Sequence, residues 1–376
     1  MSTPPRIVAF ADHPDLSASV HDFNCRMAAK GYSEYHFSES PHSRQFPKKA
    51  GGKIWMEYFL ILDGRKVRGG YILKFQPFFC RGRKLDLNFL KLPISEGLID
   101  PVHAPLGIQL LQDCVRRSPN LFALGMGGLS AKLPQLLRKM KWRTLEVPFY
   151  FQVCNLPTFL QNISILKGRR LLGSLAKLTV TTGLASILGS LLNALTSIKL
   201  HLAAQSQAEQ VGNFGEWSDQ IWNDCKEDYG LLGCRTSETL NCWYTSSDPR
   251  LIRLKVTQDN AVLGWALAVC TQHCDHKYFG SMKVAAIVDC LSKPEHSPLV
   301  VQAATRFLRQ LGPDLIISNQ LHQSWRHSLI QSGYLRGPSN FAMALSPKLS
   351  NKLDAMKVPT EDFHINRGDG DGPIHL

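Results

Sequence analysis

The feature that most constrains this chain is an internal repeat. An acidic residue, two leucines, two prolines, a histidine and a glutamine stand at fixed spacings in the first half and recur in the second half without a gap. The matching pairs are Glu96 and Asp289, Leu98 and Leu291, Pro101 and Pro294, His103 and His296, Pro105 and Pro298, Leu106 and Leu299, and Gln109 and Gln302. One offset, 289 − 96 = 193, relates every pair. A repeat at a fixed offset predicts a duplicated structural unit, so we expect two domains of one kind.

The similarity between the two halves extends beyond this core. Upstream, Asp63-Gly64 and Asp259-Asn260 are turn signals, and each precedes an apolar stretch. Downstream, Trp142 of the first copy aligns with Tyr334 of the second. The offset drifts by one residue in these flanks, which short loop insertions explain. The whole fold is therefore predicted to be duplicated, and not only a short motif.

Hydrophobic periodicity and turn residues predict the same order of elements in both copies. In the first copy we expect a hairpin of strands over 54–62 and 67–79, a strand over 85–94, a helix over 105–117, a strand over 121–124, a helix over 132–140 and a strand over 148–153. In the second copy we expect a hairpin from 251, a strand over 283–289, a helix over 298–310, a strand over 315–318, a helix over 322–332 and a strand over 341–345. This order predicts an α+β fold in which a helix crosses between neighbouring strands.

The order of these elements resembles the GNAT superfamily of acyltransferases, here in tandem. A strand runs into a loop and a helix, and a later helix closes on Lys141-Trp142 or Gly333-Tyr334 before a last strand. The turn at 67–70 and the glycine-rich stretch at 368–373 are similar to those of bacterial tandem-GNAT proteins linked to polysaccharide production. The resemblance implies two GNAT-like domains, each a twisted mixed sheet flanked by helices. It also implies transfer of an acyl group from a thioester, acetyl-CoA or another acyl-CoA, to an amine such as a polysaccharide precursor.

The expected domain organisation has four parts. They are an N-terminal GNAT-like domain over 1–160, an amphipathic helical connection over 161–210, a C-terminal GNAT-like domain over 211–350 and a flexible tail over 351–376. Within the connection, 178–198 carries no charge, and leucines and isoleucines form one stripe over 184–198. This stripe either packs on the domains or lies at a membrane interface near lipid phosphates.

The resemblance implies that the phosphates of acyl-CoA would lie at the start of the central helix, where backbone N–H groups favour anions. The candidate residues are His103, Leu106 and Gly107 in the first copy, and His296 and Ser297 in the second. The family's glycine-rich signature is missing from both copies, although Gly107 keeps one glycine and Ser297 could cap its helix. The alternative for each histidine is a structural role beside a helix start.

Two carboxylates are candidate proton acceptors, because each is predicted to stand where a strand ends beside the family's reaction site. These catalytic candidates are Glu96 and Asp289, and each could instead be a surface acid paired with Lys91 or Lys293. The family's usual general acid is a tyrosine, but Leu137 and Leu329 occupy the corresponding positions. A non-catalytic protein that binds or assembles partners is therefore the competing hypothesis.

Composition narrows the partners and the compartment. A formal charge of +13 predicts an anionic partner, yet the basic residues do not gather in one tract, which argues against nucleic acid. The exception is an aminoacyl-tRNA donor, which the resemblance to peptidoglycan-bridge enzymes of duplicated GNAT fold implies. Ten scattered cysteines and an N-terminus without a long apolar run favour a cytoplasmic protein, and the stripe over 184–198 leaves open a peripheral contact with the inner face of the membrane. Cysteines and histidines over 270–276 lack zinc-site spacing, so we expect a polar hairpin loop and no metal.

Overall fold

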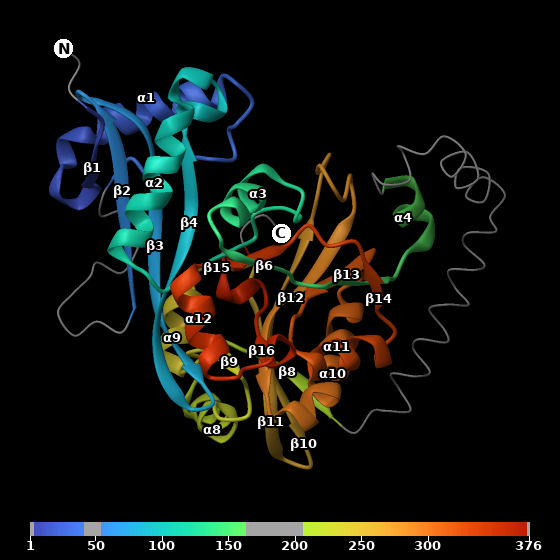
Figure 1. Cartoon of the computed structure of the whole chain (residues 1–376). Helices are drawn as coiled ribbons and strands as arrows, with labels where there is room; N and C mark the ends of the chain where they lie inside the picture. The colour runs from blue at the N-terminus through green and yellow to red at the C-terminus, as the bar shows by residue number, and fades with distance from the viewer. Residues whose placement is uncertain (1–3, 41–53, 163–205, 374–376) are drawn as a thin grey trace. The chain divides into compact units, whose positions relative to one another are not determined.

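The computed structural model describes residues 4–40, 54–162 and 206–373, which fall into two compact units (Figure 1). Of the described residues, unit 1 contains 4–40, 54–78, 84–145 and 342–357, and unit 2 contains 79–83, 146–162, 206–341 and 358–373. The stripe predicted over 184–198 lies outside the described residues, as does most of the connection over 161–210. Each unit therefore draws on more than one stretch of the chain.

Unit 1 is built on a mixed sheet with the strand order β1-β2-β3-β4-β5-β15-β6. Its strands are β1 (Arg6–Ala9), β2 (Trp55–Asp63), β3 (Lys66–Cys80), β4 (Arg83–Ser95), β5 (Leu121–Leu124), β6 (Arg143–Glu146) and β15 (Ala342–Leu345). Its helices are α1 (Ser17–Ala28), α2 (Ala104–Arg117), α3 (Lys132–Lys139) and α12 (Pro347–Ala355). Helix α2 buries Leu106, Leu110, Leu111 and Cys114 along one face, as its apolar spacing predicts.

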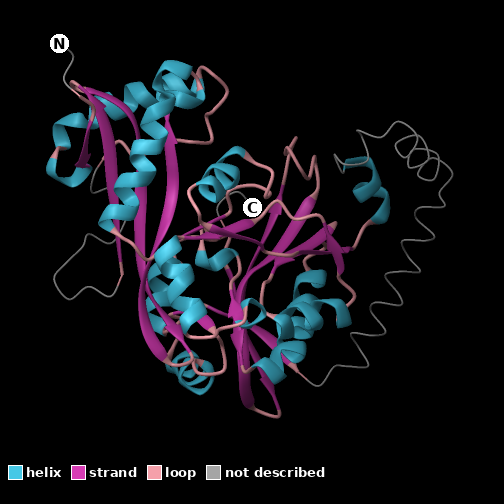
Figure 2. Ribbon diagram, viewed as in Figure 1, coloured by secondary structure: helices cyan, strands magenta, loops and turns pink. Residues whose placement is uncertain are grey.

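Unit 2 is built on a second mixed sheet with the order β14-β7-β13-β12-β11-β10-β8, and helices lie against it (Figure 2). Its strands are β7 (Phe149–Val153), β8 (Gln207–Val211), β10 (Ile252–Gln258), β11 (Ala261–Gln272), β12 (Lys283–Ser292), β13 (Leu315–Asn319) and β14 (Leu335–Gly337), with the short pair β9 (Leu231–Gly233) and β16 (Phe363–His364). Its helices are α4 (Leu156–Asn162), α8 (Glu216–Cys225), α9 (Ser237–Trp243), α10 (Ser297–Gln310) and α11 (Gln323–Gln331).

The two sheets have the same topology, which confirms the predicted duplication and the α+β class. Starting from β8, unit 2 has the order β8-β10-β11-β12-β13-β7-β14, and each strand matches the strand at the same place in unit 1. In both units a parallel pair, β4 with β5 or β12 with β13, stands inside the sheet. A helix, α2 or α10, connects the two strands of that pair, as a parallel crossover requires.

The last strand of each copy joins the other copy's sheet. Strand β7 follows the first copy in sequence but pairs with β13 and β14 in unit 2, whereas β15 follows the second copy and pairs with β5 in unit 1. The sequence predicts both strands correctly and assigns both to the wrong sheet. Hydrophobic pattern marks a strand without naming its partner, because pairing depends on contacts distant in sequence.

Each hairpin has a glycine at an equivalent place just after its turn, Gly69 in the first copy and Gly264 in the second. The first turn contains Gly64 at φ 62°, and the second contains Asp259 and Asn260 at φ 48° and 65°. A bulge follows each turn, in the pairing of β2 with β3 and of β10 with β11. After the bulge, a Cβ on Gly69 would lie 2.4 Å from the Ile94 carbonyl oxygen, and one on Gly264 would lie 2.5 Å from that of Leu291. The backbones approach too closely there for any other residue.

The fixed offset of 193 residues aligns the helix starts of the two copies but does not align the ends of their strands. His103 and His296 each immediately precede the helix of their copy. Between the end of β4 and α2, however, lie residues 96–103, whereas only residues 293–296 separate β12 from α10. Glu96 consequently follows the end of its strand, as predicted, but Asp289 lies inside β12 and is not its structural counterpart. The prediction that a strand ends at Asp289 is wrong.

Residues 351–373 belong to the packed structure. The sequence predicts a flexible tail over 351–376, but the end of α12, β16 and the turn Arg367–Asp369 lie in this range. Leu353, Phe363 and Ile365 are buried in their units, and so is the charged residue Asp369. Long-range contacts hold the segment in place.

Candidate functional site

A buried carboxylate in unit 1 lies between two arginines. Glu96, the first residue after β4, is 3% exposed. Arg26 of α1 donates from Nε to Oε1 at 2.6 Å, and Arg68 of β3 donates from Nη1 to Oε2 at 2.6 Å. Arg68 also donates to Asp63 at 3.2 Å. Both oxygens of Glu96 therefore accept charge-assisted hydrogen bonds.

These arginines control the ionisation of Glu96. Burial on its own raises the pKa of the carboxyl, but the hydrogen bonds and charges of Arg68 and Arg26 outweigh it and hold the pKa below the ordinary value. A general base for an amine works best with a pKa near working pH. The geometry thus favours a role for Glu96 as a fixed counter-ion, and its predicted role as a proton acceptor stays a prediction.

The start of helix α2 lies beside this carboxylate. His103 Nε2 is 3.7 Å from Glu96 Oε2, and the histidine precedes the helix without capping it through its side chain. Ala104 and Pro105 in the first turn are exposed, and Gly107 is half-buried. Leu106, predicted to contact a cofactor, instead packs in the core of unit 1. The first turn of α2 is therefore open, with basic side chains nearby.

The parallel pair of unit 1 separates at this same end. Strand β4 pairs with β5 only at Asn88 with Leu121 and at Phe89 with Phe122, although β4 continues to Ser95. Beyond Phe89, Lys91 to Pro93 are half-buried. Ligands of parallel sheets bind outside the carboxyl ends of the strands, where neighbouring strands part. The separation of β4 from β5 and the open start of α2 together form our candidate site.

In unit 2 the corresponding separation is filled by the chain itself. Strand β12 pairs with β13 from Val284 to Ile287 and then continues to Ser292. Beyond that point, Asn366 forms a β-bridge with Gln320 and donates from Nδ2 to Asp289 at 2.9 Å. Every residue of β12 after Lys283 is buried. The C-terminal segment thus lies where β12 and β13 have separated.

Asp289 is the centre of a buried polar network. It accepts hydrogen bonds from Arg235 Nε at 2.9 Å, from Tyr244 Oη at 3.0 Å and from its neighbour's backbone, the Cys290 N–H, at 2.8 Å. Arg235 also donates to both oxygens of Asp369 at 3.0 Å. With its oxygens engaged and almost no exposed surface, Asp289 holds the C-terminal segment in place. Its predicted catalytic role stays a prediction.

The start of α10 differs from that of α2. His296 precedes the helix as predicted, but Ser297 is its first residue and not its cap. The Ser297 hydroxyl donates to the Pro294 carbonyl at 2.7 Å and lies 2.8 Å from Ser328 Oγ of α11. Because Ser297 is fully buried under α11, this helix start is covered.

The resemblance implies a tyrosine as general acid at one position of each copy, and neither copy has a tyrosine there. Leu137 and Leu329 lie there, and both are buried in the cores of their units. Tyr334 is buried as well and lies 3.0 Å from Thr305 through its hydroxyl. In both units these side chains pack and do not face a reaction site.

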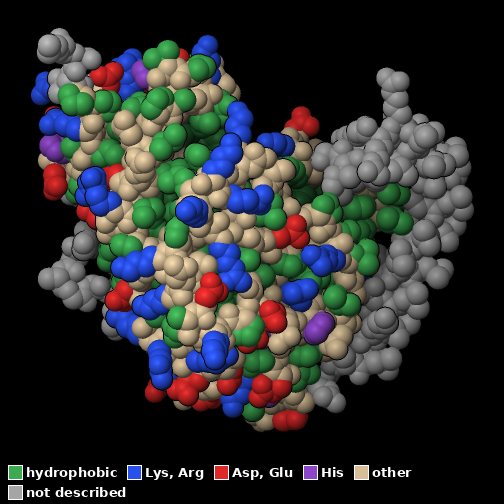
Figure 3. All heavy atoms as spheres, viewed as in Figure 1, with side chains coloured by type: hydrophobic (Ala, Val, Ile, Leu, Met, Phe, Trp, Pro, Cys, Tyr) green, Lys and Arg blue, Asp and Glu red, His purple; other side chains and the backbone are tan. Residues whose placement is uncertain are grey.

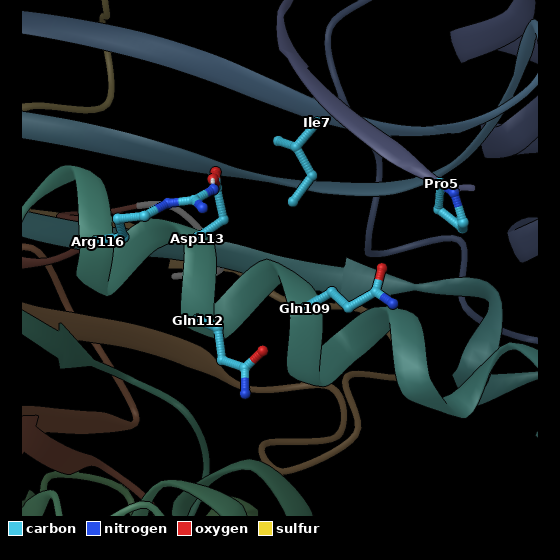
Figure 4. A pocket seen from close by; sticks show the side chains of 6 residues that line it. All are labelled: Pro5, Ile7, Gln109, Gln112, Asp113 and Arg116. Carbon is cyan, nitrogen blue, oxygen red and sulfur yellow. Dashed lines mark hydrogen bonds and ion pairs between the residues drawn. The ribbon is translucent and has the colours of Figure 1, made fainter. Parts of the chain in front are cut away.

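A hollow of about 350 Å³ lies along the later turns of α2 (Figure 4). Its lining residues are Pro5, Ile7, Gln109, Gln112, Asp113 and Arg116. The buried Asp113 carboxylate accepts hydrogen bonds from Tyr71 and Arg117, which, with Arg116, hold its pKa below the ordinary value although burial alone would raise it. The hollow does not contain the predicted site residues.

Several other sequence expectations concern surfaces and loops. Residues 273–282 form a loop between β11 and β12, and His276 Nδ1 accepts from the N–H groups of Tyr278 and Phe279. Among the described residues, no three metal-ligating side chains gather as a metal site and no helix has the length and apolar character to span a membrane. On the face in Figure 3, Lys and Arg side chains are dispersed among acidic and apolar ones.

The partners of both carboxylates were missed by sequence reasoning. Arg26, Arg235 and Tyr244 stand in stretches without a motif, so nothing in the sequence pointed to them. Arg68 and Asp369 did fall within the two stretches singled out by resemblance, at 67–70 and 368–373. Those two stretches could therefore have pointed to the partners, because Arg68 bonds to Glu96 directly and Asp369 bonds to Arg235, the partner of Asp289.

No protein-family model matches the sequence, and no curated protein matches it. Among solved structures, N-myristoyltransferase of Saccharomyces cerevisiae with bound myristoyl-CoA has a TM-score of 0.47 at 8% identity, over 78% of this chain and 69% of that one. A GCN5-related N-acetyltransferase from Anabaena variabilis has a TM-score of 0.49 at 9% identity, over 91% and 72%. A tandem GNAT protein from the clavulanic acid biosynthesis pathway has 0.47 at 11%, over 91% and 99%. Similarity at this level assigns neither a family nor an activity.

Proposed function

We propose that the chain is an acyltransferase that moves an acyl group from a thioester, acyl-CoA, to an amine, and that unit 1 binds the donor. The observation that carries this proposal is the separation of β4 from β5 at the end of the sheet where α2 starts. Unpaired strand edges there can hydrogen-bond the amides of a pantetheine arm, and the N–H groups of the exposed first turn can bind its phosphates.

The start of α2 supports an anionic donor through the N–H groups of its exposed first turn. Arg26, Arg68 and His103 lie nearby, but the carboxylates of Glu96, Asp63 and Asp100 pair with them, so the support does not come from a net positive charge. His103 and Gly107 are the residues that we propose to contact the phosphates. Leu106 supports the helix from the core instead. In unit 2, His296 and Ser297 stand at a covered helix start, so we propose no donor site there.

The acceptor that we propose is an amine on a polysaccharide precursor, which follows from the resemblance of the sequence and not from the site. A charged tRNA is the alternative donor that the missing glycine signature allows. Proton transfer from the amine remains assigned to Glu96 as a hypothesis, and Glu96→Gln tests it. Unchanged turnover per folded molecule would remove Glu96 from the chemistry and leave it as a counter-ion.

A non-catalytic binding protein is the second candidate function. The buried leucines at 137 and 329 favour it, because no side chain replaces the tyrosine that protonates the leaving thiolate. The filled separation in unit 2 favours the same function for that unit. This candidate predicts donor binding or partner binding without turnover.

Calorimetry of the full chain with CoA, acetyl-CoA and a long-chain acyl-CoA tests the proposal. We expect saturable binding of at least one of them. Gly107→Glu should weaken that binding roughly tenfold, because a carboxylate in the first turn repels the phosphates. The matched control is Gln112→Glu, which adds the same charge at an exposed position five residues later on α2 and should bind as wild type does. No heat with any of the three ligands would refute donor binding.

A further inference from the structure

One guanidinium group in unit 2 is held in place without a counter-ion. Arg367 is half-buried and donates from Nε to Asn319 Oδ1 at 2.8 Å. Its guanidinium carbon lies 5.1 Å from the centre of the Phe341 ring. In the part of the chain that the structure describes, no carboxylate pairs with Arg367, and its Nη1 and Nη2 groups donate to no protein acceptor. The Nε edge of the guanidinium is thus occupied by Asn319 and one of its faces by Phe341, while the N–H groups of Nη1 and Nη2 remain available as donors.

The backbone that carries Arg367 is fixed from both sides. Asn366 and Asp369 form a reciprocal capping box around the turn Arg367–Asp369. Asn366 bonds to Asp289, and Asp369 bonds to Arg235, all of them buried. The buried network around Asp289 therefore sets the position of a neighbouring arginine that takes no part in it.

The side chain of Arg367 is fixed by an equally rigid partner. Asn319, the last residue of β13, is fully buried, and its Nδ2 group lies 3.4 Å from the Pro148 carbonyl oxygen. The Asn319 amide oxygen is thereby directed at Arg367. The arginine stands at the carboxyl end of a parallel strand, which is the usual side for ligands.

An arginine in this state is costly unless something binds it. Burial lowers the pKa of Arg367 to about 10, which means that its charged form is poorly solvated. The desolvation of the buried Arg235 is offset by ion pairs with two carboxylates, whereas Arg367 contacts only one neutral amide and one aromatic ring. A neutral side chain could make comparable packing contacts without the desolvation of a charge.

We propose that Arg367 binds an oxyanion, the carboxylate or phosphate group of a ligand, through Nη1 and Nη2. The planar fork of arginine matches both groups and forms two parallel charge-assisted hydrogen bonds. This anion site lies in unit 2 and goes beyond the proposed function, which places the thioester in unit 1. A failure to bind anions at Arg367 would not contradict the thioester site in unit 1, and a failure to bind acyl-CoA would not contradict the anion site.

Titration of the full chain with inorganic phosphate and with acetate, at constant ionic strength, tests the anion site. We expect saturable binding of at least one anion, and the tighter one identifies the class of ligand. Arg367→Gln should weaken that binding about tenfold or more, the loss expected for a charge-assisted pair. Arg367→Lys keeps the charge but lacks the fork, so its affinity should fall between the two. Arg250→Gln, an exposed arginine paired with Asp248, is the matched control and should bind as wild type does.

Two results would overturn the assignment. One is the absence of saturable binding of either anion by wild type up to about 50 mM. The second result is that wild type and both Arg367 variants bind the anion with equal affinity. If Arg367→Gln then also has a lower unfolding midpoint than wild type, the role of the residue is structural. An unfolding midpoint for ligand-free Arg367→Gln at or above that of wild type, together with weaker anion binding, supports the proposal.

Discussion

Replacing Glu96 with Gln removes the negative charge between two arginines of unit 1 and keeps the size of the side chain. Removing one partner of a buried ion pair costs about 3–5 kcal/mol, because the other partner is left uncompensated. The side chains of Arg26 and Arg68 are 28% and 18% exposed, so water compensates them in part. We therefore expect Glu96→Gln to lower the free energy of unfolding by about 2–3 kcal/mol.

The loss should depend on pH in a defined direction. The pKa of Glu96 is lowered in the folded state, so its carboxylate stabilises the fold above the pKa of an unfolded glutamate, about 4.3. That contribution disappears as pH falls through the lowered folded pKa. The difference between wild type and Glu96→Gln should be largest near neutral pH and should close in acid.

Urea unfolding of wild type and Glu96→Gln across this pH range measures the difference. For a unit of roughly 150 residues, a loss of 2–3 kcal/mol corresponds to about 4–12 °C in the thermal midpoint. Glu39→Gln is the matched control in the same unit, since Glu39 pairs with His21 on the surface and should contribute little. Equal stability of wild type and Glu96→Gln at neutral pH would refute the ion-pair reasoning, as would a difference that grows in acid.

Three further predictions address the cores and the buried network. Leu137→Ala should lower the free energy of unfolding by about 2–5 kcal/mol in urea titrations, because Leu137 is fully buried in the core of unit 1; a loss below about 1 kcal/mol would contradict that packing. Gly264→Ala should lower the thermal midpoint, since its Cβ would lie 2.5 Å from a carbonyl oxygen, whereas Gly212→Ala meets no atom within 4 Å and should change it little; equal midpoints would contradict the close approach. Burial, and then the nearby second carboxylate, raise the pKa of Asp369 against the pull of Arg235, so ionisation of Asp369 costs stability as pH rises above its unfolded pKa. Asp369→Asn should therefore become more stable relative to wild type as pH rises, and urea unfolding that shows a constant difference would count against this.

Much of the fold could be predicted from residues close together in the sequence. The helix predicted over 105–117 is α2 (Ala104–Arg117), and the strand predicted over 121–124 is β5 (Leu121–Leu124). Apolar spacing, proline at a helix start and turn residues are local signals, and they act on the backbone before any distant contact forms. The same signals missed β6 and α12, where short elements carry little periodicity.

The candidate site was predicted less completely than the fold. Glu96 follows the end of its strand and His103 precedes its helix, as the sequence predicts, and the structure brings the two within 3.7 Å of each other. The arginines that decide the ionisation of Glu96 come from α1 and β3, far away in sequence. Alignment also paired Glu96 with Asp289, because a gapless match cannot reveal that one connection is longer than the other.

The amino-acid sequence by itself determined that one module occurs twice, which elements each copy contains and in what order they come, because these follow from patterns within a few turns of chain. Only the tertiary structure decided that β7 and β15 change sheets, that the C-terminal segment lies where β12 and β13 separate in unit 2, and that Arg367 has no counter-ion among the residues that the structure describes. Each of these depends on pairing between residues distant in sequence or on the burial of a charge, and neither has a local signature in the sequence.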